Sequence, residues 1–186
     1  VSVEVDPRLA RDTAATIDAA RTLDDQISSP NLYIKIPGTR EGLPAITKMI
    51  SEGRSINVTL LFSIQRYAEV IDAYMSGLEM VDGDLSHISS VASFFISRTE
   101  TEVDSRLDEI DSEPALKLKG KTAVAQGQLA YRLFIDEFNS DRWLALKARG
   151  AQLQRPLWAS TSTKNPQYPD TMYVDELIGP DTVNTL

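Results

Sequence analysis

Short stretches with strand character alternate along the chain with longer stretches that have helical periodicity. In residues 1–6, valines alternate with polar residues, which is the two-residue period of a β-strand. Further strand-like stretches begin near residues 31, 55, 90, 155 and 182. Most of them are separated by apolar positions at helical spacing, so that a helix follows each strand. The pattern predicts an α/β protein with a parallel sheet, built from βα units of roughly 25 to 35 residues.

Turn residues and capping residues set the limits of the predicted helices. Asp6 and Pro7 predict that the first helix begins directly after the first strand, with Asp6 as its N-cap. This helix is expected to end at the turn of residues 28–30. The second helix is expected to end at Gly53, and the third to span residues 63–78.

Two architectures fit a parallel sheet of this kind, an open doubly wound sheet and part of a (β/α)₈ barrel. Strands of an open sheet pack helices on both faces and are apolar on both. Here several strands carry one polar face, formed by Glu4, Lys35, Asn57, Thr59 and Ser93. Such side chains converge on the interior of a TIM barrel. No Gly-rich loop follows the first strand, as a dinucleotide-binding sheet would require. The sequence therefore favours an incomplete (β/α)₈ TIM barrel.

Residues 99–150 break the alternation of strands and helices. They keep helical periodicity throughout, with apolar positions such as Val103, Leu107, Leu129 and Phe134. The stretch is too long for a single crossover helix. We therefore expect a helical insertion between the fourth and fifth strands.

Composition narrows the classes of function. The chain has 186 residues, of which 42% are hydrophobic and 25% charged, as in a globular domain with one core. It has no cysteine and one histidine, His87, so disulfides, thiolate catalysis and metal sites built from Cys and His are excluded. The net charge of −8 argues against nucleic acid as a partner. No apolar run approaches the ~20 residues that cross a membrane and no signal peptide is recognised, so a cytoplasmic protein is expected.

Lys35 lies in the apolar run Leu32–Pro37, which otherwise predicts a buried strand. Burial disfavours a charged ammonium group, and a neutral amine can attack a carbonyl to form a Schiff base. The alternative interpretation is a lysine at a sheet edge whose ammonium group reaches water. Schiff-base catalysis also needs a carboxylate to shuttle protons, polar groups to hold water and cationic anchors for an anionic substrate.

Neighbouring strands supply such groups on the same face or at their ends. The candidate site residues, in chain order, are Glu4, Lys35, Asn57, Thr59, Ser93, Arg98, Ser162 and Lys164. Taken singly, each could be a solvated surface group, and Arg98 could pair with Glu100 or Glu102. Together they form one predicted site, in which Arg98 and Lys164 lie beside hydroxyl groups and could bind phosphate.

The motifs around these residues resemble those of transaldolase, and the resemblance covers the whole chain. They are Glu4-Val5-Asp6, Ile34-Lys35-Ile36-Pro37-Gly38-Thr39, Ile56-Asn57-Val58-Thr59-Leu60-Leu61-Phe62-Ser63, Ser93 with Arg98, and Trp158-Ala159-Ser160-Thr161-Ser162-Thr163-Lys164-Asn165-Pro166. Residues 173–185 resemble the longer transaldolases of actinobacteria and similar lineages.

The resemblance implies a catalytic role for three residues. Lys35 would form the Schiff base, while Glu4 and Thr59 would hold the water that shuttles protons. The family transfers a dihydroxyacetone unit from sedoheptulose 7-phosphate to glyceraldehyde 3-phosphate, which gives erythrose 4-phosphate and fructose 6-phosphate. This reaction of the pentose phosphate pathway uses neither a metal nor an organic cofactor.

The resemblance also implies the substrate-binding residues. Asn57 would contact hydroxyl groups near the reacting carbonyl, and Ser93 and Arg98 would bind the sugar phosphate. Ser162 would lie beside Lys164, which stands where many members of the family have an arginine.

The resemblance further implies that residues 1–186 form a single partial barrel domain. We expect about strands three to eight of the family's barrel, without the first two βα units and the last helix. The catalytic aspartate and an asparagine of those two units would then be missing. Asp6 is no substitute, because it belongs to the Glu4-Val5-Asp6 motif. Turnover by this chain alone should be low.

Two other functions stay open. Another class I aldolase on the same fold, such as a fructose-6-phosphate or deoxyribose-phosphate aldolase, would use the same lysine chemistry. Glu4 and the insertion at residues 99–150 favour transaldolase, because the fructose-6-phosphate type is shorter and lacks the insertion. The third possibility is a catalytically silent fragment that binds sugar phosphates.

Overall fold

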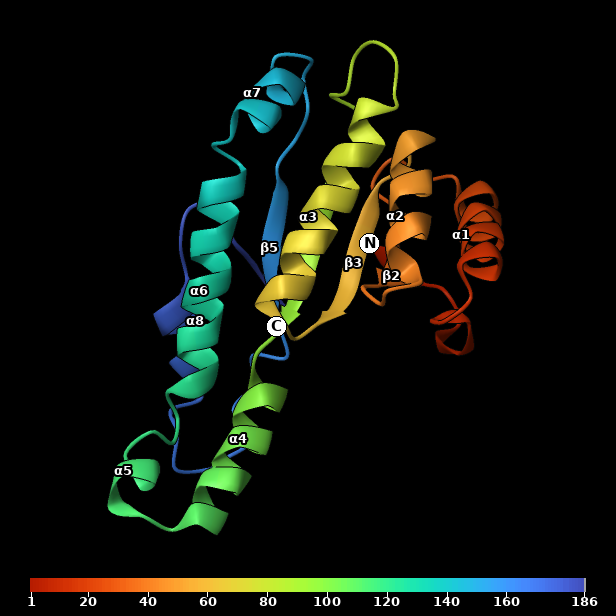
Figure 1. Ribbon diagram of the computed structural model, residues 1–186. Coiled ribbons are helices and arrows are strands. Elements are labelled where there is room, and N and C mark those ends of the chain that lie inside the picture. Colours follow the sequence, from red (N-terminus) through yellow and green to blue (C-terminus); the bar gives the residue numbers. More distant parts are fainter. Residues whose placement is uncertain (186) are drawn as a thin grey trace.

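The computed structural model describes residues 1–185, which form one parallel sheet with helices packed on one of its faces (Figure 1). The strands are β1 (Ser2–Glu4), β2 (Tyr33–Pro37), β3 (Ile56–Leu61), β4 (Ser90–Phe95), β5 (Gln154–Ala159) and β6 (Val183–Asn184). Their order in the sheet follows the chain order, and every neighbouring pair is parallel. Within the described residues β1 and β6 do not pair, so the sheet is not closed. The predicted α/β class and incomplete barrel are confirmed.

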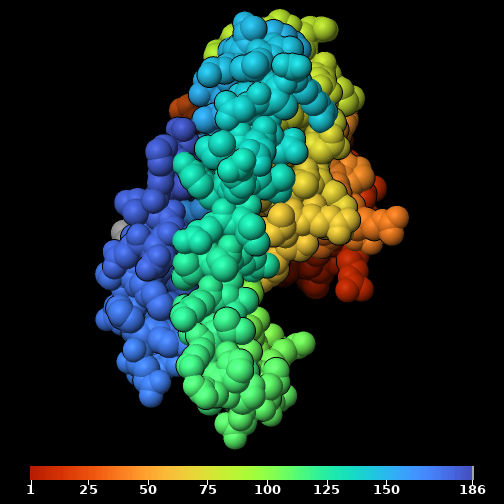
Figure 2. Space-filling view, turned by 60° about the vertical axis from the view of Figure 1, so that its left-hand side comes forward, coloured from red at the N-terminus to blue at the C-terminus, as the bar shows by residue number. Residues whose placement is uncertain are grey.

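Helices make every crossover between the strands. They are the short 3₁₀ helix η1 (Pro7–Leu9) and α1 (Thr13–Ile27), α2 (Gly42–Ser51), α3 (Ile64–Glu79), α4 (Ser97–Ile110), α5 (Glu113–Leu116), α6 (Thr122–Glu137), α7 (Asp141–Lys147) and α8 (Met172–Leu177). Four of them, α4 to α7, separate β4 from β5, which confirms the helical insertion. Figure 2 shows α4 and α5 (green) as a protrusion from the body of the molecule. None of the helices in residues 1–185 has the length and apolar character to span a membrane.

The main core lies between the sheet and the helices α2, α3 and α6. Alternate residues of β2 and β3, namely Ile34, Ile36, Ile56 and Val58, are 0% exposed because they face these helices. Gly77 lets α3 approach α2 closely, since a Cβ atom there would lie 2.7 Å from Ile50 Cβ.

The first helix begins later than Asp6 and Pro7 predict. Asp6 accepts a hydrogen bond from the Arg8 backbone N–H over 2.9 Å, but it caps only η1. A turn then reorients the chain, and α1 begins at Thr13, where the Asp12 side chain accepts a hydrogen bond from the Ala15 N–H over 3.0 Å. Asp12 can cap because its backbone is extended, with φ −129°. The predicted C-terminal limit is confirmed by the left-handed Ser28 at the end of α1.

A bulge interrupts the regular alternation of β3. The register with β4 shifts between Val58 and Leu61, and Leu60 adopts a left-handed conformation with φ 60°. As a result Leu61 is completely buried in the main core, although strict alternation from Thr59 would place it on the opposite face. The ring of Phe62 lies 5.2 Å from that of Phe95, centroid to centroid.

The second face of the sheet, here called the inner face, carries no helix and combines polar and apolar side chains. A small apolar cluster of Val91, Phe95, Leu157 and Ala159 occupies its β4 and β5 side. The polar residues lie mainly on the β1, β2 and β3 side. This separation places the candidate lysine at the polar part of the inner face.

Candidate active site

Glu4 and Lys35 are direct neighbours on the inner face. The register of the parallel pairs places Glu4 beside Lys35 and Lys35 beside Asn57. The Lys35 Nζ lies 3.4 Å from Glu4 Oε2, a contact between a carboxylate and an ammonium group. The strands therefore bring this carboxylate and this lysine together, as the order of the motifs along the chain predicts.

Lys35 is neither fully buried nor at a sheet edge. β2 pairs with β1 on one side and with β3 on the other, so the edge interpretation is wrong. The Lys35 side chain is 27% exposed, whereas its neighbours Ile34 and Ile36 are 0% exposed. The expectation of a fully buried strand fails at this position because the inner face has no covering helices.

Asn57 is buried, and hydrogen bonds fix the orientation of its amide. The Ser93 hydroxyl donates to Asn57 Oδ1 over 2.7 Å, and Asn57 Nδ2 donates to Ser2 Oγ over 3.1 Å. Ser2 is not among the residues that the motifs predict, although it occupies a polar position of the first strand. The structure thus joins Asn57 and Ser93 into one hydrogen-bonded group.

Thr59 is 0% exposed, and its Oγ1 has no hydrogen-bond partner within residues 1–185. A buried hydroxyl without a partner costs about 1–3 kcal/mol, so such groups usually have a role. Thr59 lies two residues after Asn57 on β3, immediately before the Leu60 bulge. Its hydroxyl is suited to hold a water molecule or a polar group of a ligand, the role that the resemblance implies.

Arg98 lies in the first turn of α4 and is exposed. Its guanidinium carbon lies 4.9 Å from the centroid of the Phe95 ring. In the part of the chain that the structure describes, Arg98 forms no ion pair. Glu102 pairs with Arg106 instead over 2.7 Å, and Glu100 is 2% exposed. The guanidinium group is therefore available to an anion.

One pocket of about 410 Å³ brings three of the candidates together. It is lined by Lys35, Phe95, Arg98, Ala159, Ser160, Thr161, Ser162 and Thr185. Lys164 does not line it, but its Nζ donates a hydrogen bond to Ser162 Oγ over 2.7 Å. Glu4, Asn57, Thr59 and Ser93 are not among its lining residues either. Three cations, Lys35, Arg98 and Lys164, thus surround this region of a chain whose net charge is −8.

Ser97 and Ser160 connect the start of α4 to the segment that follows β5, beside this pocket. Neither residue belongs to the predicted site. The Ser97 N–H donates to the Ser160 carbonyl oxygen over 2.9 Å, and the two hydroxyl oxygens lie 2.9 Å apart. Ser160 adopts a left-handed conformation with φ 57°. Backbone strain of this kind in a non-glycine residue is characteristic of functional sites. Ser160 lies within the Trp158–Pro166 motif and Ser97 lies next to Arg98, so these positions in the sequence are the available signal.

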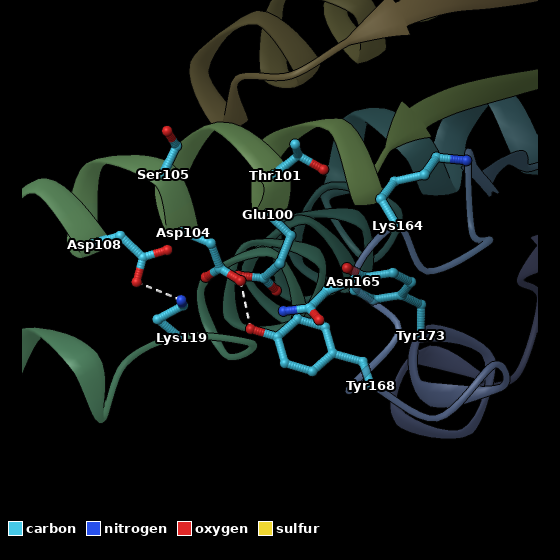
Figure 3. Close-up of a pocket in the computed structure, with 10 residues that line it drawn as sticks. All are labelled: Glu100, Thr101, Asp104, Ser105, Asp108, Lys119, Lys164, Asn165, Tyr168 and Tyr173. Carbon is cyan, nitrogen blue, oxygen red and sulfur yellow. Dashed lines mark hydrogen bonds and ion pairs between the residues drawn. The ribbon is translucent and has the colours of Figure 1, made fainter.

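A second pocket, of about 260 Å³, lies between α4 and the segment that follows β5 (Figure 3). Acidic residues of α4 form one wall, and Asn165, Tyr168 and Tyr173 form the other. Burial raises the pKa of the Glu100 carboxyl group, which lies in this wall. The ammonium group of Lys164 points away from the carboxylates in Figure 3. In residues 1–185, no group of three or more His, Cys, Asp and Glu side chains could hold a metal ion.

Comparisons with known proteins agree with the motifs. The sequence model of the family described as Transaldolase/Fructose-6-phosphate aldolase matches residues 1–186. The chain is 58% identical over 189 residues to a transaldolase of Acidothermus cellulolyticus, which covers 100% of the chain and 50% of the relative. Transaldolases of Thermobifida fusca and Mycolicibacterium smegmatis are each 57% identical over 189 residues, with 100% of the chain and 51% of each relative covered.

These matches have one consequence for the extent of the chain and one for its identity. The chain spans about half the length of the curated relatives that it matches. The match to the family model nevertheless includes every residue of the chain, and the identity to the curated relatives is far above what a shared fold alone would give. The chain belongs to the transaldolase/fructose-6-phosphate aldolase family.

Proposed function

We propose that this chain carries the Schiff-base lysine and the phosphate-binding residues of a transaldolase. The observation that supports the proposal most directly is the shared pocket, in which Lys35, Arg98 and Ser162 line one space. A sugar phosphate has a carbonyl group for the lysine and an anionic end for the arginine and the hydroxyl group. The substrates are sugar phosphates, and the transferred group is the dihydroxyacetone unit.

In the proposed reaction the Lys35 amine adds to the ketose carbonyl. The Glu4 carboxylate, 3.4 Å from Nζ, takes up a proton as the amine attacks and returns it as water leaves the carbinolamine. Thr59 Oγ1 would hold the water of this exchange. The hydroxyl group beside the bond that breaks then gives up its proton to an acid–base residue, the electrons of the carbon–carbon bond pass to the protonated imine, and an aldose phosphate leaves. The enamine left on Lys35 then attacks the acceptor aldehyde, and hydrolysis frees the lysine.

The other predicted residues bind the substrate in this proposal. The Asn57 amide would contact hydroxyl groups beside the reacting carbon. Ser93, for which the resemblance implies a phosphate contact, is buried and donates to Asn57, so in this proposal it orients the amide instead. Arg98, Ser162 and Lys164 would hold the phosphate group, since all three can donate hydrogen bonds to its oxygen atoms.

The proposal also concerns the extent of the catalytic machinery. We treat residues 1–186 as a partial barrel domain that corresponds to about strands three to eight of the family's barrel. In the described residues β1 and β6 are the two edge strands and do not pair with each other, which supports this correspondence. The acid–base residue for carbon–carbon cleavage would then come from the family's first strand, so Schiff-base formation rather than turnover is the reaction to test. The proposed location of the enzyme is the cytoplasm.

Trapping of the Schiff base tests the proposal. The chain is incubated with fructose 6-phosphate and borohydride, and the reduced adduct is located by peptide mass. The adduct is expected on Lys35 and is expected to disappear in Lys35→Met, while the matched control Lys48→Met on α2 should keep it. An adduct on another lysine, or none in the unmodified chain, would contradict the proposal.

A class I aldolase such as fructose-6-phosphate aldolase is the second candidate, since the family includes both activities. The four helices between β4 and β5 favour transaldolase, because the shorter aldolase type lacks this insertion. Erythrose 4-phosphate distinguishes the two through whatever slow carbon–carbon cleavage this chain supports. A transaldolase passes the lysine-bound unit to this acceptor, so adding the acceptor should deplete the adduct, whereas an aldolase releases free dihydroxyacetone.

A further inference from the structure

The segment that carries Ser162 and Lys164 has no helix or strand of its own. Residues 160–171 run from the end of β5 to α8. A turn organises the middle of the segment, because the Gln167 N–H donates to Asn165 Oδ1 over 2.9 Å and the Tyr168 N–H donates to the Asn165 carbonyl oxygen over 3.1 Å. Irregular segments of this kind depend on bonds to other elements for a fixed position.

Tyr168 supplies such a bond, because its hydroxyl donates a hydrogen bond to Asp104 Oδ2 on α4 (Figure 3). The other oxygen of this carboxylate accepts a hydrogen bond from the Gly120 N–H over 3.2 Å, so both oxygens have partners. Asp104 is 8% exposed, and a charge-assisted hydrogen bond is strong where water is largely excluded. Burial and the nearby Asp104 carboxylate raise the pKa of the Tyr168 hydroxyl, which therefore stays protonated as the donor.

The Tyr168 ring is also held sterically. A Cβ atom on Gly120 would lie 3.0 Å from Tyr168 Cζ, so the ring packs directly on the backbone that precedes α6. The hydroxyl group and the ring thus fix the same residue from two sides.

Helix α4 is the common support of both parts of the proposed phosphate site. Arg98 lies in its first turn, and Asp104 follows six residues later, which is about 9 Å along the helix axis. The segment after β5 is tied to α4 at two points, by Ser160 near the start of the helix and by Tyr168 farther along. Both Ser162 and Lys164 lie between these two points in the chain.

We propose that Asp104 and Tyr168 are positioning residues for phosphate binding. Their hydrogen bond holds the segment with Ser162 and Lys164 at a fixed distance from the Arg98 guanidinium group, so that one phosphate can contact all three side chains. The inference rests on the proposed function and adds to it two residues that touch neither the substrate nor Lys35.

Comparison of a ketone with a phosphate group and a ketone without one separates phosphate binding from the reaction at the lysine. Adduct formation on Lys35 is measured under borohydride as a function of the concentration of fructose 6-phosphate and, separately, of dihydroxyacetone, which has no phosphate. In Tyr168→Phe, which removes only the hydroxyl group, the half-saturating concentration of fructose 6-phosphate should rise about ten-fold. The value for dihydroxyacetone should stay unchanged, because this ketone has no anionic group to bind.

A double-mutant cycle tests whether the two residues act through one bond. In an Asp104→Ala background, adding Tyr168→Phe should not change the half-saturating concentration of either ketone any further. Tyr131→Phe is the matched control, since it removes a hydroxyl that donates to the Pro180 carbonyl oxygen over 3.1 Å on the α6 side. It should leave both half-saturating concentrations unchanged.

The outcomes distinguish this inference from the proposed function. If the unmodified chain forms no adduct on Lys35 with either ketone, the proposed function fails and the inference fails with it. If the adduct forms but Tyr168→Phe changes the half-saturating concentration of neither ketone, or changes both equally, only the positioning role is rejected. An undiminished effect of Tyr168→Phe in the Asp104→Ala background likewise rejects it.

Discussion

Asn57 on the third strand donates a hydrogen bond to Ser2 on the first strand, over 3.1 Å and across the strand between them. Neighbouring strands of a sheet lie about 4.8 Å apart, so the first and third strands of a flat sheet would be separated by about twice that distance. Two short side chains can close this gap only because the sheet is strongly concave on its inner face. The curvature is that of a barrel wall.

Loss of the Ser93 hydroxyl should destabilise the protein. Ser93→Ala leaves Asn57 Oδ1, in a side chain that is 5% exposed, without its donor at 2.7 Å. We expect the free energy of unfolding to fall by about 1–3 kcal/mol in urea denaturation. Ser86→Ala is the surface control, because it removes an exposed hydroxyl that donates to Asp84, and it should cost less stability than Ser93→Ala. Equal stability of the two variants would show that Ser93 does not orient Asn57.

Replacement of Glu4 should slow formation of the Lys35 adduct. Glu4→Gln keeps the shape of the side chain but removes the carboxylate 3.4 Å from the amine. A lost general acid–base group typically costs on the order of 10²–10⁴-fold in rate, and the rate of adduct formation under borohydride measures it.

Asp6→Asn is the control for this prediction. Asp6 belongs to the same motif, but a hydrogen bond from Arg8 holds the pKa of its carboxyl group at about 2, so it stays ionised and paired with Arg8. The control should keep the rate of the unmodified chain. Equal slowing of both variants would assign the effect of Glu4→Gln to general changes in charge.

The stability of the protein should depend on pH through Glu100. Burial raises the pKa of this carboxyl group above its ordinary value of 4.5, so the folded state retains a proton that the unfolded state releases. The free energy of unfolding therefore falls as the pH rises from 4.5 through the pKa of the folded state. Glu100→Gln should be more stable than the unmodified chain at pH values above this range.

Denaturation curves at several pH values check this prediction. The advantage of Glu100→Gln should vanish below the unfolded-state pKa of 4.5, where both side chains are neutral. The neutral amide can still accept the hydrogen bond that the Ala123 N–H donates to Glu100 Oε2 over 3.2 Å. A difference that does not change with pH would contradict the assignment.

Gly77 should not tolerate a side chain. In Gly77→Ala the new Cβ would lie 2.7 Å from Ile50 Cβ and 2.8 Å from the Thr47 carbonyl oxygen, so α2 and α3 must move apart. Overpacking of this kind costs about 1–3 kcal/mol, measured as a lower urea midpoint. Gly179→Ala, whose nearest neighbour would be at 3.4 Å, should be much milder. A larger loss in Gly179→Ala would contradict this account of the helix contact.

Alternation of polar and apolar residues is sufficient to predict most of the sheet. Lys35 and Asn57 each have apolar neighbours on both sides in sequence, so the alternation alone indicates which face they occupy. The start of α1 was predicted wrongly because Asp6 and Asp12 are both competent N-caps, and only the tertiary contacts of the intervening turn select the second. Among these contacts, the Thr39 hydroxyl donates to the Ala10 carbonyl oxygen over 2.6 Å.

Features that depend on distant residues leave no periodic signal. Tyr168 and Asp104 are 64 positions apart, and neither residue type predicts the other. The bulge at Leu60 lies in the run from Leu60 to Phe62, in which every residue is apolar, so no polar position reveals the change of face.

The bulge at Leu60 divides β3 into two segments with opposite phase. Before it, the odd-numbered Asn57 and Thr59 lie on the inner face of the sheet, and after it the even-numbered Phe62 takes that side while Leu61 enters the core. Anyone who redesigns this strand for a new substrate must therefore choose positions by phase as well as by proximity. Deletion of Leu60 would remove the extra residue and leave Leu61 in the core and Phe62 on the inner face, whereas a regular, extended Leu60 would exchange the roles of Leu61 and Phe62 and place a leucine on the inner face in place of an aromatic ring.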